Sequence, residues 1–266
     1  MKLETFRRRF PPRTVRAGGQ AWRVIETRSK PGAPVLVMLP GTLGTAEIFW
    51  NQIGALGRDV RIVSVTYPRV GNLMKLAAGL KALFDKIGIA KASVVGSSMG
   101  GFLAQWFTAR YPGRVETLFI GNSLTDPYKV NPSRKPPAFL RRLPPAGHRK
   151  IVLGSVETWK EPEPIFTKLK EILLHSGRKL ISPSALKYRV LATATGKAVP
   201  PPVIPQSRTV IIECADDPLI SRLAQTAMRE NYPRATLYRL GRGGHYPYIT
   251  RPERYTRILR KHLPRA

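Results

Sequence analysis

The sequence has few cysteines, few acidic residues and no long apolar run. Cys214 is the single cysteine among 266 residues, so no disulfide can form within the chain, and we expect a reducing, cytoplasmic location. No apolar run approaches the ~18 residues of a membrane span. The basic N-terminus has no apolar segment behind it, which excludes a signal peptide of the usual kind. We therefore expect no membrane span.

The scarcity of acids leaves a large positive charge. Sixteen Asp and Glu residues stand against 45 Lys and Arg residues, a formal net charge of +29. The cations are spread along the whole chain, and the clusters Arg7–Arg9 and Arg141–Arg142 are short. A dedicated nucleic-acid site would concentrate them. We expect a generally basic surface with nonspecific, salt-sensitive polyanion binding and no specific nucleic-acid partner. The sequence gives no reason for the charge itself.

Metal and nucleotide motifs are missing as well. The chain has no H-x-x-x-H pair, no paired cysteines, no Walker A sequence and no G-x-G-x-x-G after its first apolar strand. These are the patterns that hold zinc or cradle phosphates. We expect no metal and no cofactor.

Short apolar runs alternate with helical patterns over most of the chain. The expected strands are Thr5–Arg16, Ala21–Thr27, Val35–Leu39, Arg61–Thr66, Ala92–Val95, Val115–Ile120, Thr209–Cys214 and Ala235–Leu240. The expected helices are Thr45–Leu56, Leu73–Ile87, Gly101–Arg110, Ile220–Tyr232 and Pro252–His262. Alternating strands and helices with short loops predict a mostly parallel sheet flanked by helices. The fold class is therefore α/β.

The alternation breaks after Asn122-Ser123. Residues 125–205 are rich in proline, contain helical patterns near Glu163–His175 and Ser184–Ala194, and carry no strand pattern. We expect residues 1–124 and 206–266 to form the α/β core, and residues 125–205 to form an inserted helical cap.

Gly96-Ser97-Ser98-Met99-Gly100 fits the G-x-S-x-G pattern between an expected strand and an expected helix. In that setting the pattern is typical of a nucleophile elbow. Glycines flank so tight a turn because neighbouring side chains have no room. The turn lifts the Ser98 hydroxyl above the sheet edge, at a helix N-terminus where backbone N–H groups can stabilise an oxyanion. Ser98 is the expected nucleophile.

A serine nucleophile needs a base and a carboxylate that orients it. His245 lies in a glycine-rich loop after the last strand, whereas the other three histidines lie in the expected cap or at the last helix end. Asp216 and Asp217 both follow the penultimate strand, where the acid of this arrangement usually lies. Asp217 is preferred, Asp216 is the alternative, and Asp126 is a more distant one.

The oxyanion needs two donors. One expected donor is the backbone N–H of Met99, directly after the nucleophile. The other is expected in the turn Pro40-Gly41-Thr42-Leu43-Gly44 after the first parallel strand, with Thr42 preferred. Many hydrolases carry His-Gly in this turn, and Pro40 departs from that pattern without removing the main-chain donor.

These residues together resemble the α/β-hydrolase superfamily over nearly the whole chain. Within it, the chain is most similar to the maspardin family and its bacterial relatives. That similarity rests on the segments Leu39-Pro40, Gly44–Phe49, Tyr67-Pro68, Gly100–Gln105, Gly121–Ser123 and Gly243–Tyr248. In maspardin an asparagine stands where this chain has His245. The resemblance therefore implies that maspardin is a binding protein, whereas this chain keeps an intact catalytic set.

The sequence thus favours a serine hydrolase of the esterase kind that cleaves a small-molecule acyl substrate without a cofactor. A maspardin-like adaptor, and an acyltransferase or another enzyme that uses the same elbow, remain alternatives. Four residues of the expected cap are candidates for lining the acyl pocket, namely Phe139, Leu140, Trp159 and Phe166. Substrate, acyl-chain length, cap mobility and oligomeric state are left open by the sequence.

Overall fold

A computed structural model describes residues 1–130 and 135–264 of the chain. Its centre is an eight-stranded sheet in the order β1-β2-β4-β3-β5-β6-β7-β8. The strands are β1 (Arg13–Ala17), β2 (Gln20–Glu26), β3 (Val35–Leu39), β4 (Arg61–Thr66), β5 (Ala92–Ser97), β6 (Val115–Gly121), β7 (Thr209–Cys214) and β8 (Thr236–Leu240). The pairs β1–β2 and β2–β4 are antiparallel and all other pairs are parallel. The expected mostly parallel α/β sheet is confirmed.

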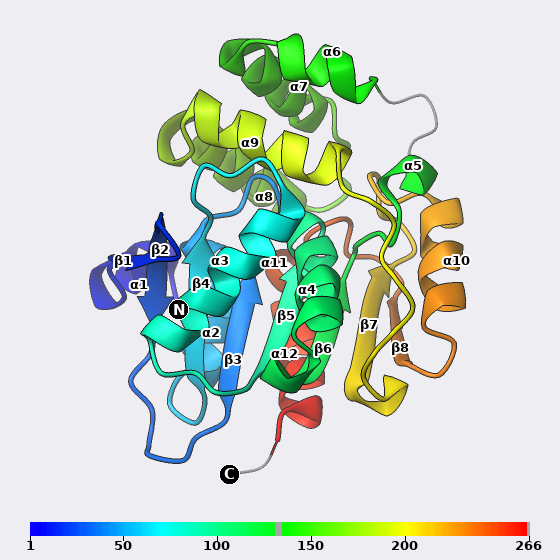
Figure 1. Ribbon diagram of the computed structural model, residues 1–266. Helices are drawn as coiled ribbons and strands as arrows, with labels where there is room; N and C mark the ends of the chain where they lie inside the picture. Colours follow the sequence, from blue (N-terminus) through cyan, green and yellow to red (C-terminus); the bar gives the residue numbers. More distant parts are fainter. Residues whose placement is uncertain (131–134, 265–266) are drawn as a thin grey trace.

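Helices cover both faces of this sheet (Figure 1). On one face lie α3 (Leu73–Lys86), α4 (Met99–Arg110) and α10 (Arg222–Asn231), and on the other lie α1 (Leu3–Arg9), α2 (Trp50–Leu56) and α12 (Pro252–His262). The central strands β3 and β5 are buried along almost their whole length. Continuous apolar strands of this kind belong to a sheet that is covered on both faces. The core therefore consists of two apolar layers, one on each side of the sheet.

The chain begins differently from the expectation. The sequence predicted a strand over Thr5–Arg16, but residues Leu3–Arg9 form helix α1 and only Arg13–Ala17 pair in the sheet. Phe6 of α1 is fully buried, and Arg7 donates to the Glu47 carboxylate at 2.6 Å. Burial of one apolar residue and an ion pair hold this short helix against the core.

Between β6 and β7 the structure has helices α5 to α9 and, among the described residues, no strand. They are α5 (Pro127–Val130), α6 (Pro137–Arg142), α7 (Pro145–Glu157), α8 (Pro164–His175) and α9 (Pro183–Ala194), with a π-helical turn at Ser176–Leu180. We call this segment, residues 127–194, the helical insertion. Figure 1 shows α6 to α9 gathered beyond the carboxyl ends of the strands.

Two helices of the insertion, α6 and α7, were not expected from the sequence. Each begins with a proline at its first position, Pro137 and Pro145. Proline lacks only an N–H that a first-turn residue leaves unpaired anyway, and its fixed φ suits the helix. Pro137 and Pro145 therefore start helices instead of interrupting them.

No helix in the described parts of the chain is long and apolar enough to cross a membrane.

Candidate active site

Ser98 sits in a strained turn between β5 and α4. Its φ and ψ are 54° and −122°, in a region that residues other than glycine rarely adopt. The Ser98 N–H donates to Gly121 O at 3.0 Å, and Ser123 Oγ donates to Ser98 O at 2.7 Å. Contacts from the end of β6 thus hold both peptide groups of Ser98. This turn is the elbow geometry that the sequence predicted.

The glycines around Ser98 are required by close backbone approach. A Cβ atom on Gly96 would collide with the Gly100 carbonyl, and one on Gly100 would collide with the Leu39 carbonyl. A Cβ on Gly41 would lie 3.3 Å from Ser98 Cβ. The loop after β3 therefore passes directly beside the Ser98 side chain.

His245 and Asp217 form a buried pair in the loops after β8 and β7. The His245 Nδ1 atom lies 2.8 Å from Asp217 Oδ2 and 3.0 Å from Asp217 Oδ1. Their side chains are 1% and 0% exposed. The Asp217 carboxylate also accepts the N–H groups of Leu219 at 2.7 Å and Ile220 at 3.0 Å. This carboxylate orients the imidazole through Nδ1, so Nε2 is the ring nitrogen that does not face Asp217.

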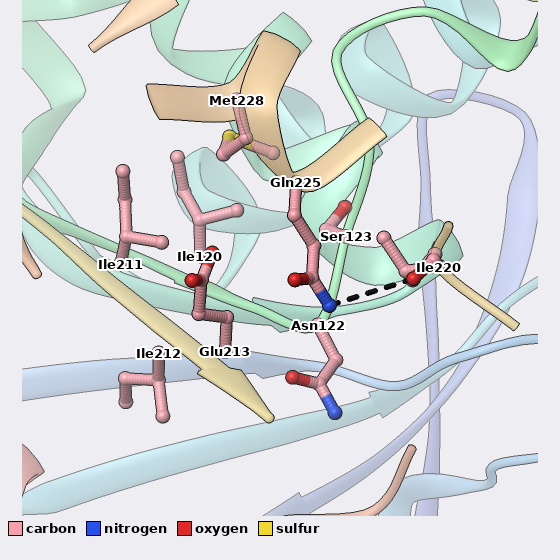
Figure 2. A pocket seen from close by; sticks show the side chains of 9 residues that line it. All are labelled: Ile120, Asn122, Ser123, Ile211, Ile212, Glu213, Ile220, Gln225 and Met228. Carbon is pink, nitrogen blue, oxygen red and sulfur yellow. Dashed lines mark hydrogen bonds between the residues drawn. The ribbon is translucent and has the colours of Figure 1, made fainter. Parts of the chain in front are cut away.

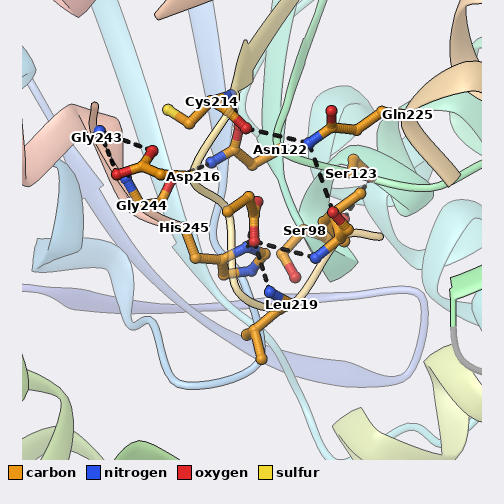
Figure 3. Close-up of polar contacts among 12 residues, drawn as sticks. Ser98, Asn122, Ser123, Cys214, Asp216, Leu219, Gln225, Gly243, Gly244 and His245 are labelled. Carbon is orange, nitrogen blue, oxygen red and sulfur yellow. Dashed lines mark hydrogen bonds and ion pairs between the residues drawn. The ribbon is translucent and has the colours of Figure 1, made fainter. Parts of the chain in front are cut away.

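Asp216, the alternative acid, faces elsewhere. Its carboxylate accepts the backbone N–H groups of Gly243 and Gly244, each at 3.0 Å. Figure 3 shows these contacts on the far side of the loop from the His245 ring. The two adjacent carboxylates therefore have different partners. Asp217 contacts the imidazole, and Asp216 anchors the loop that carries it. No hydrogen bond joins Asp126 to His245 in the described part of the chain, and the Asp126 carboxylate instead accepts the Tyr128 N–H at 2.8 Å.

Asn122 ties the same loop to the sheet. Its side chain donates to Gly244 O at 2.6 Å and accepts the Cys214 N–H at 2.9 Å (Figure 3). Its φ of 36° lies in the left-handed region. No role in the site was expected for Asn122 and Ser123 from the sequence, where they mark the end of the strand–helix alternation and form part of the family resemblance. Their position directly after the strand beside the elbow strand is the signal that could have found them.

Thr42, an expected oxyanion donor, lines the same cavity as Ser98, and Met99, the other, follows Ser98 directly in the chain. Met99 is the first residue of α4, so its N–H has no acceptor within the helix. The Thr42 N–H donates to no acceptor among the described residues.

Ser98 and His245 line one cavity of about 390 Å³ under the helical insertion. Its walls come mainly from α7, α9 and the loops after β3, β6, β7 and β8. Among the described residues that line it there is no lysine, arginine or carboxylate, despite the high positive charge of the chain. The cavity is lined by Thr42, Leu43, Ser98, Leu124, Pro127, Ile151, Val152, Ser155, Val156, Trp159, Val190, Thr193, Ala194, Leu219, Ile220, His245 and Tyr246.

Of the four aromatic and apolar lining candidates, the structure brings one to this cavity. Trp159 lines it, whereas Phe139 on α6 is 44% exposed and Leu140 is not among the lining residues. Phe166 is buried behind the loop, where a Cβ on Gly244 would lie 2.9 Å from its ring. Lining positions depend on helix packing, which the sequence pattern does not fix.

A second cavity lies behind Asn122, between β6, β7 and α10 (Figure 2). It holds about 10 Å³, room for roughly one water molecule. Gln225 crosses it to donate to Ile220 O at 3.4 Å, as the dashed line in Figure 2 marks. A space of this size is a packing gap and excludes any substrate.

Burial keeps the other ionisable groups near the site in their neutral forms. Burial raises the pKa of the Tyr246 phenol, and the negative charge of Asp217 raises it further. Burial likewise raises the pKa of the Cys214 thiol to about 12. Neither group carries a charge at neutral pH, so neither competes with His245 for a proton.

Comparison with known proteins identifies the family of this fold. The model of the alpha/beta hydrolase family matches residues 36–258. This chain belongs to that family. The expected α/β-hydrolase fold and superfamily are therefore confirmed.

Individual hydrolase-family relatives cover nearly all of the chain. Maspardin from Danio rerio is 29% identical over 250 residues, which are 92% of this chain and 78% of the relative. The putative carbamate hydrolase RutD from Klebsiella pneumoniae is 25% identical over 264 residues, 88% of this chain and 92% of the relative. The solved enol-lactonase from Burkholderia xenovorans superposes with a TM-score of 0.74 at 16% identity, over 94% of this chain and 99% of that one.

Proposed function

We propose that this alpha/beta hydrolase is a serine esterase that cleaves uncharged esters with an apolar acyl group. The observation that carries the proposal is the buried Asp217–His245 pair, 2.8 Å apart, whose histidine lines the same cavity as Ser98. Serine, carboxylate and histidine in this chain order and on these loops match the arrangement of catalytic hydrolases.

The reaction begins with attack on the ester carbonyl carbon by Ser98 Oγ. His245 Nε2 takes the hydroxyl proton, and Asp217 stabilises the imidazolium that forms. The carbonyl oxygen becomes an oxyanion, which accepts hydrogen bonds from the Met99 and Thr42 amides. A donor of this kind contributes about 3 to 4 kcal/mol to the stability of the transition state.

The tetrahedral intermediate then expels the alcohol, to which His245 returns the proton, and an acyl-Ser98 ester remains. Water repeats the cycle: His245 removes its proton, the oxygen attacks the acyl carbon, and Ser98 leaves with the proton.

The cavity favours a neutral, apolar acyl group. Its walls carry leucine, isoleucine, valine, proline and tryptophan side chains and no fixed charge. A carboxylate or phosphate entering it would lose water without gaining a charged partner. We propose that the helical insertion is the cap of this acyl pocket, with α7 and α9 as its roof. The high net charge of the surface therefore does not determine which acyl group the pocket binds.

A fluorophosphonate probe and p-nitrophenyl esters from acetyl to decanoyl test the proposal. We expect Ser98 to be labelled and the esters to be hydrolysed, with losses of about 10⁴-fold or more in Ser98→Ala and in His245→Asn. The second variant places in this chain the asparagine that maspardin has. A wild-type protein that is folded, unlabelled and inactive on all esters would support the non-catalytic adaptor instead. Ester products formed only with an added alcohol would indicate an acyltransferase.

A further inference from the structure

The loop that holds Thr42 has every carbonyl from Pro40 to Gly44 engaged in a hydrogen bond. Tyr67 donates to Pro40 O at 2.8 Å, and the Gly44 N–H donates to Gly41 O at 3.0 Å. The other three carbonyls are bound by two residues of the helical insertion, Ser176 and Arg189.

Arg189 on α9 makes the larger share of these contacts. Its Nη1 donates to Thr42 O at 2.9 Å and to Gly44 O at 2.7 Å. The side chain is among the largest fully buried ones, at 2% exposed. A buried arginine normally faces a carboxylate, yet no described carboxylate pairs with Arg189. Its guanidinium lies 5.5 Å from the centre of the Tyr67 ring instead.

Burying a charge without a partner of opposite charge destabilises the folded protein, so we expect Arg189 to have a specific role. Burial lowers the pKa of Arg189 to about 10, so the side chain still carries its positive charge at neutral pH. Two carbonyl oxygens and one aromatic face are all that replace the lost water. A methionine of similar length would fill the same space without this cost. What methionine lacks is the ability to hold two peptide carbonyls of the loop at once.

Ser176 binds the Leu43 carbonyl, which lies between the Thr42 and Gly44 carbonyls in the chain. It opens the π-helical turn after α8, is 3% exposed, and donates from Oγ to Leu43 O at 2.6 Å. Gly177 follows, and a Cβ there would lie 2.5 Å from Leu153 Cδ2 and 3.0 Å from Leu43 Cδ2. The glycine lets the insertion approach the loop closely enough for this bond. π-turns of this kind often occur at functional sites.

In a planar trans peptide the C=O and the following N–H point in opposite directions. Binding a carbonyl therefore also sets the direction of the next N–H. The Gly41 carbonyl fixes the Thr42 N–H, and the Thr42 carbonyl on Arg189 fixes the Leu43 N–H. Arg189 holds Gly44 through its carbonyl, and the Gly44 N–H donates to Gly41 O, the carbonyl whose peptide carries the Thr42 N–H. Arg189 therefore acts on the Thr42 amide through this turn, while its bond to Thr42 O holds the next peptide.

We infer that Arg189, assisted by Ser176, is a positioning residue that holds the Thr42 amide in place for the oxyanion. This inference rests on the proposed serine chemistry for its catalytic consequence. It also makes the helical insertion a fixed part of the site, because an insertion that swung away would release three carbonyls of the loop.

Arg189→Met is the decisive variant, and Arg149→Met is its matched control. Arg149 on α7 is partly buried and, like Arg189, donates to a carbonyl. That carbonyl, Ile181 O at 2.7 Å, lies within the insertion and not in the loop that holds Thr42. We expect Arg189→Met to lower kcat about 10- to 100-fold, near the effect of weakening one oxyanion donor. KM should change less than about threefold, and Arg189→Lys should recover part of the loss.

A trifluoromethyl ketone separates positioning from general loosening, because it forms an oxyanion on Ser98. Its Ki should rise by the same factor as kcat falls in Arg189→Met and stay unchanged in Arg149→Met. Ser176→Ala is a milder change and should shift both quantities in the same direction by a smaller factor. If the two arginine variants lose activity and inhibitor affinity equally, or if KM alone changes, the inference is wrong. Should Arg189→Met not fold, Arg189→Lys and Ser176→Ala provide the same comparison.

Amide hydrogen exchange gives a readout that needs no activity. The Gly44 N–H is bonded inside the loop to Gly41 O. Its exchange should speed up at least about tenfold in Arg189→Met and remain as in the wild type in Arg149→Met. An unchanged Gly44 rate in Arg189→Met overturns the inference even in an active enzyme. An inactive wild type in which this rate still responds to Arg189 overturns the proposed function and leaves the loop-holding role supported.

Discussion

Asp217 and His245 lie 2.8 Å apart with almost no solvent access, although 28 positions separate them along the chain. The neighbouring carboxylate of Asp216 binds the Gly243 and Gly244 amides instead. Two adjacent residues therefore have separate partners, and substitution of each should have a separate effect.

Asp217→Asn should lower kcat about 10⁴-fold, because an amide can no longer fix the imidazole tautomer that leaves Nε2 free to accept a proton. Asp216→Asn should lower kcat less than about tenfold and lower the melting temperature, since it weakens the anchor of the loop. Steady-state ester hydrolysis and thermal unfolding of both variants measure this. A larger kcat loss in Asp216→Asn would reverse the assignment.

Gly100→Ala should destabilise the fold by about 3 kcal/mol or more, because its Cβ would collide with the Leu39 carbonyl, which cannot move without shifting β3. Gly154→Ala is the matched control: Gly154 lies within α7, where a Cβ meets nothing within 4 Å. There the change should stabilise by about 0.5 to 1 kcal/mol. Urea unfolding gives both values. Equal stabilities of the two variants would show that the elbow is looser than its geometry indicates.

Ala194→Phe should shorten the acyl chain that the enzyme accepts. Ala194 on α9 lines the cavity, and an aromatic ring there would fill part of the 390 Å³. We expect kcat/KM for the decanoyl ester to fall roughly tenfold or more, with a change of less than about threefold for the acetyl ester. Ala146→Phe, on the exposed first turn of α7, should leave the profile unchanged. An equal loss on both esters would place the acyl group elsewhere.

Glu26 should make stability depend on pH. Burial raises the pKa of this carboxyl, but hydrogen bonds from Arg13 and Arg61 outweigh it, so the net pKa is lowered. A lowered folded-state pKa stabilises above the ordinary carboxyl value of about 4.3 and ceases to do so as the pH falls through the folded-state value. Glu26→Gln should therefore cost about 1 kcal/mol at pH 7 and nothing in strong acid.

The control for that series is Glu230→Gln, on an exposed position of α10. Urea unfolding across the acid range should give the same pH curve for this variant as for the wild type. If Glu26→Gln differed from the wild type by the same amount at every pH, the link to the two arginines would be refuted.

The sequence predicted the sheet, the elbow and the histidine loop because each depends on local pattern. Glycines at positions 96 and 100 and the apolar strand before them require the turn at Ser98 wherever the rest of the chain lies. Asp217 was preferred over Asp216 from the sequence, but pattern alone left Asp216 open, since adjacent side chains leave a loop in different directions and only the folded loop decides which one meets the ring.

Arg189 and Ser176 were beyond the reach of sequence patterns. Arg189 meets Thr42 across 147 positions, and nothing near Arg189 in the chain distinguishes it from the many other arginines of this basic protein. Its partners are main-chain oxygens, which every residue possesses, so no pairing of residue types marks the contact. Only the packing of α9 over the loop makes this one arginine different.

The placement of Asp217 and His245 after the last two strands has a consequence for biosynthesis. During translation, Ser98 emerges from the ribosome long before β7 and β8 exist, so the nascent chain carries an alcohol with no base to activate it. Under the proposed serine chemistry, reactivity would be acquired only when β7 docks against β6 and β8 against β7. On that proposal, a growing chain is inert toward cellular esters until its last few dozen residues have been made.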